Sequence, residues 1–395
     1  KCEHFGTCGG CKWQNMKYAS QLDFKQNEVL NNLKRIGGTE LPPHSEILGS
    51  ENKYFYRNKM EFTFSNKRWL TTKEVQSETE IEDKDALGFH VPGMFDKVIN
   101  LNNCHLQKEP SNAIRLSVKQ FADENKLTYF DIRNQEGLLR NLMVRTSSTN
   151  DLMVLVQFYE NDKKNIKLLM EHIKISFPEI TSLLYIVNQK ANNTMYDQDV
   201  VCYNGEDYIM EEMDGLHFKI GAKSFFQTNS EQAKILYRKT KELAQITEND
   251  LVYDLYTGTG TIAQYVATSA KKVVGIDSVE EGIKAAYENA ERNNIENCTF
   301  YTGDMKEIFT DEFITKNGNP DVIITDPPRD GMHKKVVEKI LKIGAKRIVY
   351  VSCNSATQAR DFALMSEKYK LIHIQPVDMF PQTHHVENIV VMELR

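Results

Sequence analysis

The sequence lacks long apolar runs. None of its apolar stretches approaches the roughly 18 residues that a membrane-spanning helix needs, and no charged, apolar and small-residue leader opens the chain. These absences predict a cytoplasmic protein that makes no contact with a membrane. The sequence also has no internal repeat and no low-complexity tract, which excludes repeat architectures.

A strong net charge is missing as well. The formal net charge is −6, which argues against a protein coated in nucleic acid, although it overlooks local basic patches such as 163–167 and 334–347. Cysteines are few, with seven among 395 residues, odd in number and scattered. Without a secretory leader, this pattern fits a reducing compartment in which thiols serve metals or catalysis rather than disulfides.

The chain is longer than one core usually supports, so at least two domains are expected. We place the boundary after residue 220. Residues 221–395 alternate between apolar strands and helices, which is typical of a parallel sheet buried on both faces. The seven predicted strands are 251–256, 272–277, 298–304, 320–328, 347–353, 371–380 and 386–394. Only five residues separate the last two, so the final strand should return antiparallel. This α/β arrangement resembles the class I, Rossmann-like methyltransferases.

Residues 1–220 lack that alternation. They show strand-like stretches and two helical stretches, which predict an α+β domain with an antiparallel sheet. The strand-like stretches are 58–65, 141–148 and 152–159, and the helical ones are 20–36 and 162–174. The acidic stretch 71–86 has no apolar period and is expected to be a solvated loop.

A glycine-rich turn, DLYTGTGT (254–261), lies between a predicted strand and a predicted helix. Glycines there let the backbone approach a ligand, but the third glycine of a dinucleotide fingerprint is absent. Asp277 ends the next strand, where it can accept hydrogen bonds from ribose hydroxyls. These features fit NAD and S-adenosylmethionine alike. The acid–proline–proline turn at 326–328 favours S-adenosylmethionine, because many methyltransferases face the substrate base with such a turn.

The strand 347–353 ends on Cys353. A free cysteine most often packs as a small hydrophobe, but ligands of open α/β sheets bind outside the carboxyl ends of the strands. Carbon 5 of a pyrimidine becomes nucleophilic once a thiolate adds to carbon 6, and a base must later remove the proton of carbon 5. Cys353 is the candidate nucleophile and Glu387 the candidate base, with His384 and His385 as competitors for the second role.

Three cysteines open the chain with the spacing C-x5-C-x2-C, namely Cys2, Cys8 and Cys11, and Cys104 is available as a fourth ligand. Four thiolates also form closed zinc sites. Zinc ribbons, however, usually have two C-x-x-C knuckles, and the second is absent, so a four-iron, four-sulfur (4Fe-4S) cluster fits better. The two remaining cysteines, Cys202 and Cys298, lie in apolar surroundings and are expected in the core.

Several motifs together resemble the RNA 5-methyluridine methyltransferases. They are ITDPPRDG (324–331), YVSCN (350–354), MFPQTHHVE (379–387) and GAKSFFQTN (221–229). The resemblance implies Cys353 as nucleophile and Glu387 as base. It also implies a shell for S-adenosylmethionine and the active site, in which we include a glycine of the turn: Gln227, Tyr256, Gly258, Asp277, Asp304 and Asp326. Thr261 departs from the asparagine that some members carry.

The stretches CEHFGTCGGCKWQ (2–14) and NLNNCHLQ (100–107) resemble the iron–sulfur-containing 23S ribosomal RNA (uracil-5-)-methyltransferases. This implies a 4Fe-4S cluster on Cys2, Cys8, Cys11 and Cys104. It also implies a monomer that acts on a loop of 23S ribosomal RNA with a flipped uridine, because carbon 5 cannot react inside a stack. Such members commonly carry a small RNA-binding barrel before the cluster, whereas this sequence begins at the cysteines.

The domain 1–220 is the expected RNA reader. Cations could bind phosphate and aromatics could stack on bases, and an ordinary strand edge is the alternative. The candidates are Tyr56, Arg57, Asn58, Lys59, Arg140, Asn141 and Arg145. Alternative functions are a transfer RNA uracil-5 methyltransferase, an RNA cytosine-5 methyltransferase, a non-catalytic iron–sulfur RNA-binding protein and an NAD-dependent oxidoreductase. Cytosine-5 enzymes usually place a second cysteine after a proline near the fourth strand, and DPPR (326–329) has none.

Overall fold

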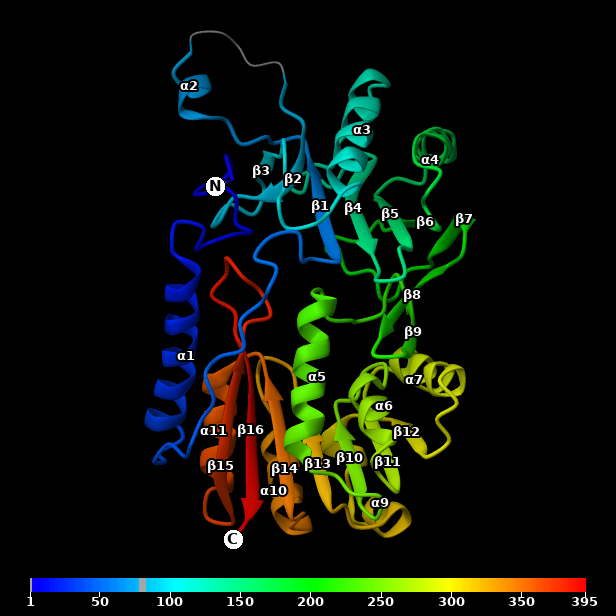
Figure 1. Ribbon diagram of the computed structural model, residues 1–395. Helices are drawn as coiled ribbons and strands as arrows, with labels where there is room; N and C mark the ends of the chain where they lie inside the picture. The colour runs from blue at the N-terminus through cyan, green and yellow to red at the C-terminus, as the bar shows by residue number, and fades with distance from the viewer. Residues whose placement is uncertain (1, 78–82) are drawn as a thin grey trace. The chain divides into compact units, whose positions relative to one another are not determined.

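The computed structural model describes residues 2–77 and 83–395, which form two compact units (Figure 1). The first unit comprises 1–15, 52–212 and 220–223, and the second comprises 16–51, 213–219 and 224–395. Across the described ranges, none of the helices combines the length and the apolar character that crossing a membrane requires. Of the predicted loop 71–86, residues 78–82 lie outside the described residues, and α2 (Thr72–Val75) is a short helix.

The first unit contains a seven-stranded sheet with the order β3-β2-β1-β4-β5-β6-β7. The strands are β1 (Lys59–Ser65), β2 (Ala86–His90), β3 (Val98–Asn100), β4 (Leu139–Thr146), β5 (Leu152–Phe158), β6 (Ser182–Val187) and β7 (Val201–Gly205). Neighbours are antiparallel except β5 and β6. The helix α4 (Lys163–Ser176) supplies the crossover that this parallel pair needs, and α3 (Ser111–Glu124) packs against α4. The predicted α+β class is confirmed, with one parallel pair in an otherwise antiparallel sheet.

The second unit contains the predicted α/β sheet, with the order β12-β11-β10-β13-β14-β16-β15. Its strands are β10 (Leu251–Leu255), β11 (Lys272–Asp277), β12 (Cys298–Thr302), β13 (Val322–Thr325), β14 (Arg347–Ser352), β15 (Tyr369–Val377) and β16 (Glu387–Leu394). The pairs among β10 to β14 are parallel, and β16 is antiparallel to both neighbours, as predicted. A separate two-stranded sheet consists of β8 (Tyr208–Met213) and β9 (Leu216–Gly221).

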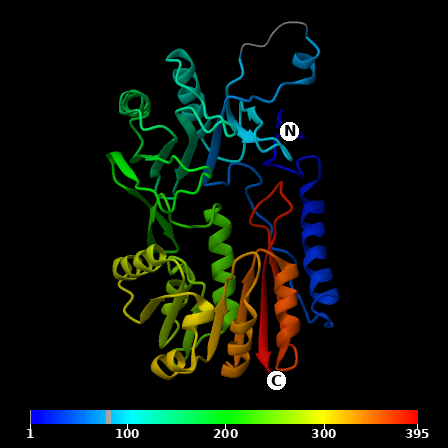
Figure 2. The ribbon, with the colours of Figure 1, turned by 180° about the vertical axis from the view of Figure 1, so that it is seen from behind.

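Helices cover both faces of this second sheet. They are α1 (Tyr18–Arg35), α5 (Ser230–Ala244), α6 (Thr261–Ala267), α7 (Glu280–Arg292), α8 (Met305–Ile308), α9 (Asp311–Asn317), α10 (Lys334–Ile343) and α11 (Ser355–Met365). Figure 1 shows α5 across one face, where it packs on β14 and β16, and Figure 2 shows the opposite face with α10 and α11. One apolar core cluster joins α1, α10 and α11 to the strands.

The helix α1 marks a difference from the predicted domain boundary. The sequence analysis assigned residues 16–51 to the first domain, but they pack with the second unit. Val29 and Leu33 of α1 are fully buried in the core cluster that also contains Phe362 of α11. Burying one such aliphatic side chain contributes about 1.5–3 kcal/mol. The two buried side chains therefore stabilise the packing of α1 in the second unit, although α1 lies near the first unit in the sequence.

Candidate active site and cysteine group

The turn that follows β10 is shaped by left-handed backbone conformations. Gly258 and Gly260 have φ values of +56° and +75°, and Tyr256 has +65°. A Cβ added to Gly260 would lie 2.9 Å from the Cβ of Ala286, so this glycine permits close packing against α7. A Cβ added to Gly258 would meet no atom within 4 Å. The turn therefore leaves open space at Gly258, as a backbone that faces a ligand requires.

Asp277, at the end of β11, joins the turn after β10 to the turn after β11. Its Oδ2 accepts a hydrogen bond from the backbone N–H of Gly258 at 2.9 Å, and its Oδ1 accepts one from Val279 at 2.9 Å. A carboxylate offers about four lone-pair sites, so Asp277 retains acceptor capacity for a hydroxyl. Burial is the largest cause of the raised pKa of Tyr256, and the nearby charges of Asp304 and Asp277 raise it further.

The remaining predicted shell residues differ in exposure. Asp304 is exposed, caps α8 through the backbone N–H of Lys306 and pairs with the Lys306 ammonium at 3.0 Å. Gln227 is buried in the segment that leads into α5. Asp304 therefore presents its carboxylate to solvent, whereas Gln227 is enclosed by protein.

Asp254 is a buried carboxyl that the sequence analysis missed. Its Oδ2 accepts hydrogen bonds from the Thr257 hydroxyl at 2.5 Å and the Ala263 N–H at 3.0 Å. Its Oδ1 is buried and has no hydrogen-bond partner among the described residues. Burial raises its pKa to about 7. An acid inside the apolar strand 251–255 was the sequence signal for this group, since a carboxyl is rarely buried without a role.

Cys353 and Glu387 meet across the ladder of β14 and β16. Ser352 pairs with Asn388 in this antiparallel ladder, and one further step places Cys353 opposite Glu387. Opposite residues of an antiparallel pair have their side chains on the same face of the sheet. Asp326 follows β13, the other neighbour of β14. The structure thus gathers a thiol and two carboxyls at three adjacent strand ends, as the strand-end argument predicted.

Arg329 completes this group. It lies on the DPPR turn, and its backbone oxygen accepts hydrogen bonds from the Asn354 side chain and the Thr357 hydroxyl, both at 3.0 Å. Asn354 also caps α11. The residue after Cys353 therefore fixes the turn that carries Arg329, and the Arg329 guanidinium lies near enough to the Cys353 thiol to lower its pKa.

The pKa values of this group share one cause. Burial raises the pKa of Cys353 to about 11, the charges of Glu387 and Asp326 add to the rise, and Arg329 opposes it. Burial also raises the pKa of Glu387 well above its ordinary value, with Asp326 as the next cause. Burial and then the charge of Asp254 raise the pKa of Asp326 to about 7. The site can therefore hold a proton on a carboxyl near neutral pH.

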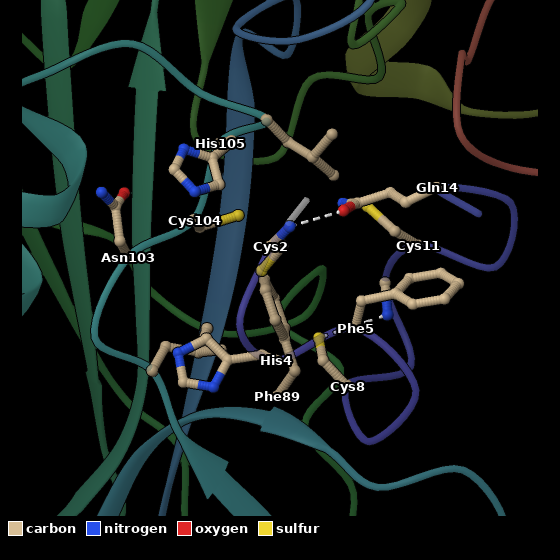
Figure 3. Close-up of a pocket in the computed structure, with 13 residues that line it drawn as sticks. Cys2, His4, Phe5, Cys8, Cys11, Gln14, Phe89, Asn103, Cys104 and His105 are labelled. Atoms are coloured by element: carbon tan, nitrogen blue, oxygen red, sulfur yellow. Dashed lines mark hydrogen bonds between the residues drawn. The ribbon is translucent and has the colours of Figure 1, made fainter. Parts of the chain in front are cut away.

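The four cysteines of the proposed metal site surround one small cavity in the first unit (Figure 3). Cys2, Cys8 and Cys11 come from the opening loop and Cys104 from the segment after β3. His4 and His105 also line the cavity, and its lining contains no carboxylate. In the part of the chain that the structure describes, no three or more Cys, His, Asp or Glu side chains are arranged to hold a metal ion.

The surroundings of these thiols suit a negatively charged centre. The backbone N–H of Gly10 donates a hydrogen bond to Cys8 Sγ at 3.4 Å. Burial raises the pKa of Cys104, and the positive charges of Arg115 and Arg57 offset part of that rise. Burial raises the pKa of Cys8 and of Cys11 to about 11, and neighbouring thiols add to the rise. To hold a metal cluster as thiolates the four sulfurs would have to lose their protons, and the Gly10 N–H and the two arginines would favour that form.

Other predicted residues need correction. Arg140 and Arg145 are 3% and 1% exposed, and Tyr56 and Asn58 are also buried, so these four cannot reach a phosphate or a base in this conformation. Arg140 instead donates to the backbone oxygens of Asn188 and Lys190. Arg57, Lys59 and Asn141 remain partly exposed. Cys202, expected in the core, is exposed on β7, whereas Cys298 is partly buried.

Comparisons with known proteins agree on one family. Residues 148–395 match the family described as tRNA (Uracil-5-)-methyltransferase. An uncharacterized RNA methyltransferase of Bacteroides thetaiotaomicron is 56% identical, over 100% of this chain and 87% of that protein. One of Porphyromonas gingivalis is 53% identical, over 99% and 86%. The crystal structure of Pyrococcus abyssi tRNA (uracil-54, C5)-methyltransferase in complex with S-adenosyl-L-homocysteine is similar, with a TM-score of 0.77, 29% identity, and coverage of 98% of this chain and 86% of that one.

Proposed function

The chain belongs to the RNA (uracil-5-)-methyltransferase family, and from this premise we propose that it methylates carbon 5 of a uridine through a covalent bond to Cys353. The observation that carries the proposal is the meeting of Cys353, Glu387 and Asp326 at adjacent strand ends. Methylation of an exocyclic amine needs no thiol, whereas carbon 5 needs one.

In the proposed reaction the Cys353 thiolate adds to carbon 6 of the uracil. The electron pair of the 5,6 double bond moves into an enolate, and carbon 5 then takes the methyl group. Glu387 next removes the proton from carbon 5, and the returning electron pair expels the thiolate from carbon 6. The raised pKa of Glu387 makes its carboxylate a stronger base for this last step.

The thiol needs help to ionise. With its pKa at about 11, only about one Cys353 in ten thousand is a thiolate at pH 7 in the free protein. The positive charge of Arg329 stabilises the thiolate, and an ionised carboxylate beside the thiol can take its proton. Arg329 thus favours the Cys353 thiolate, which is the attacking form, whereas the negative charges of Glu387 and Asp326 disfavour it.

S-adenosylmethionine is the proposed methyl donor, and it supplies a methyl group bound to a positively charged sulfur. The residues proposed to hold it are Gln227, Tyr256, Gly258, Asp277, Asp304 and Asp326. Two observations support the fit: the open space at Gly258 and the acceptor capacity of Asp277 at the adjacent strand end. The bound product in the Pyrococcus abyssi structure also supports it.

We propose that Cys2, Cys8, Cys11 and Cys104 hold a 4Fe-4S cluster. Such a cluster would cross-link the opening loop to the segment after β3. The common cavity of the four thiols, the N–H donor at Gly10 and the two nearby arginines support this assignment. Among the RNA candidates, the partly exposed Arg57, Lys59 and Asn141 remain proposed contacts.

The proposed substrate is 23S ribosomal RNA, presented to a monomer as a loop with a flipped uridine. The cysteine spacing and the motifs around it support this choice. Transfer RNA is the second candidate, because the Pyrococcus abyssi enzyme with a similar fold is named for uracil 54 of transfer RNA.

The test uses unmodified transcripts of 23S ribosomal RNA and transfer RNA, each incubated with methyl-labelled S-adenosylmethionine and digested to nucleosides. We expect label in 5-methyluridine from the ribosomal transcript. Label in 5-methyluridine from the transfer RNA alone would show that the substrate is transfer RNA, the second candidate. Label in 5-methylcytosine, or no label from either transcript, would contradict the proposed reaction.

A further inference from the structure

The helix α1 has one buried stripe with two halves of different character. Gln21, Lys25, Val29 and Leu33 follow one another at helical spacing and are all 0% exposed. The aliphatic half enters the core cluster. The polar half, Gln21 and Lys25, contacts the loop 378–386, which joins β15 to β16 and leads into Glu387.

Lys25 forms a fully buried ion pair with this loop. Its ammonium lies 2.6 Å from Asp378 Oδ1, with both side chains 0% exposed, and it also donates to the backbone oxygen of Phe380 at 3.1 Å. The Tyr18 hydroxyl donates to the other oxygen, Asp378 Oδ2, at 2.7 Å. A buried ion pair adds little net stability compared with apolar side chains, but this one ties Lys25 to two points of the loop, Asp378 and Phe380.

Gln21 holds the next part of the loop through a reciprocal amide pair. Its Nε2 donates to Gln382 Oε1 at 3.0 Å, and its Oε1 accepts from the Gln382 backbone N–H at 2.9 Å. Gln382 has φ +67°, a left-handed conformation that a residue with a side chain adopts only when its surroundings impose it. Gln21 bonds to both the backbone N–H and the side chain of this residue.

We propose that Tyr18, Gln21 and Lys25 are positioning residues that hold the loop 378–386, and through it Glu387, in the geometry for proton removal. This inference rests on the proposed function, because it needs Glu387 as the base. Misplacing a reacting group by about 1 Å can cost roughly 100-fold in rate. Cys353 directly follows β14, and the adjacent turn is held by the hydrogen bond from Asn354 to the Arg329 backbone oxygen. Loss of the α1 contacts should therefore slow the elimination step and leave the addition step intact.

The test separates the two steps with two RNA substrates. RNA with 5-fluorouridine at the target stops after methyl transfer, because fluorine cannot leave as a cation, so its rate of covalent trapping reports addition and transfer. Ordinary RNA reports the whole cycle. Three full-length variants are compared with wild type: Lys25→Met, Lys25→Met/Asp378→Leu and Gln21→Met. Lys34→Met is the matched control, since Lys34 lies on the exposed side of the same helix.

We expect the three variants to trap 5-fluorouridine RNA within about twofold of the wild-type rate, whereas their turnover of ordinary RNA falls about tenfold or more. A denaturant-stable adduct with ordinary RNA should accumulate, and Lys34→Met should behave as wild type. A folded double variant with wild-type turnover would overturn the proposal, and so would an equal loss of trapping and turnover in Gln21→Met. Should Lys25→Met not fold, the double variant, which leaves no unpaired charge, and Gln21→Met decide the matter.

Failure of the proposed function has a different signature. If wild-type protein does not trap 5-fluorouridine RNA, the covalent reaction itself is wrong. If it does trap but α1 variants keep full turnover, only the positioning role is wrong.

Discussion

The two thiol sites of this chain differ in what surrounds the sulfur. Cys353 is the one thiol at the end of β14, with Glu387 and Asp326 beside it and the positive charge of Arg329 nearby. Cys8 and Cys11 stand among other thiols, with a backbone N–H and arginines near the group. Burial raises the pKa of all three to about 11.

The difference teaches that a raised thiol pKa does not identify the role of a cysteine. A thiol among other thiols becomes a thiolate when a metal cluster binds and neutralises the repulsion. A lone thiol among carboxyls becomes one by proton transfer at the moment of reaction. The neighbours, and not the pKa, separate a proposed ligand from a proposed nucleophile, and the following experiments test that separation.

The largest effect is expected for Cys353→Ala. Methyl transfer to RNA should fall by about 10⁴-fold or more, because no other group can activate carbon 5. Binding of S-adenosylmethionine, measured by equilibrium dialysis, should stay within about twofold of wild type, and no adduct with 5-fluorouridine RNA should form. Cys298→Ala is the matched control, since Cys298 is a partly buried thiol outside both groups. A covalent adduct in Cys353→Ala would mean that the nucleophile is another residue.

Glu387→Ala should lower turnover by about 10²–10⁴-fold, the usual range for loss of a general base. Addition and methyl transfer do not need this base, so a denaturant-stable complex that carries the transferred methyl group should accumulate. Gel electrophoresis with labelled methyl measures it, and Glu367→Ala, at an exposed carboxylate of the same unit, is the control. If methylation is lost and no complex forms, Glu387 acts before methyl transfer and its assignment is wrong.

Cys104→Ser tests the four-thiol group. Wild-type protein prepared without oxygen should be brown and hold about four irons per chain, and the variant should lose them because the cluster needs all four thiolates. RNA affinity should fall more than S-adenosylmethionine affinity, since the cysteines belong to the first unit. Cys202→Ser is the control, because Cys202 is exposed and outside the group. Colourless wild-type protein that contains stoichiometric zinc would show that the four thiols hold zinc and not an iron–sulfur cluster.

The smallest effect is expected for Arg329→Met. It is measured as the rate at which iodoacetamide alkylates Cys353. Only the thiolate reacts, and the pKa is about 11, so the wild-type rate should rise about tenfold per pH unit between pH 7 and 10. Arg329 lowers this pKa, so its removal should raise the pKa and shift the profile to higher pH. At a given pH below 10, alkylation should slow about three- to tenfold, as loss of one nearby charge predicts. An unchanged profile would show that Arg329 does not stabilise the thiolate.

Much of the second unit could be predicted from the sequence, because its signals are local. Apolar strands separated by helices predicted a parallel sheet, and the short link 381–385 predicted the antiparallel return of the last strand. The same logic placed Cys353 beside Glu387. Asp254 was missed, although an acid inside an apolar strand was visible, because its burial depends on the packing of α6 above it.

The predictions that failed concern the burial of side chains and the placement of a helix, which depend on contacts between residues far apart in the sequence. Arginine is mostly a surface residue, but the segment 188–191 contacts Arg140, and both Arg140 and Arg145 are buried in the first unit. Cys202 has an apolar neighbour, Val201, yet β7 is an edge strand and leaves both exposed. The place of α1 could not be read either, because its partner in the chain lies more than three hundred positions away.

The ion pair between Lys25 and Asp378 also has a meaning for how the protein is made. The two residues are 353 positions apart, and a ribosome adds about 5–20 residues each second, so α1 waits roughly 20–70 s for its partner. During that time Gln21 and Lys25 have no loop to contact, because residues 378–386 follow α1 by more than three hundred positions. Such distant closures form late and slowly in folding. Cys353 precedes Glu387 by only 34 positions (387 − 353), or roughly 2–7 s of synthesis, so the thiol and the proposed base are made almost together, whereas α1 is made long before the loop that it holds.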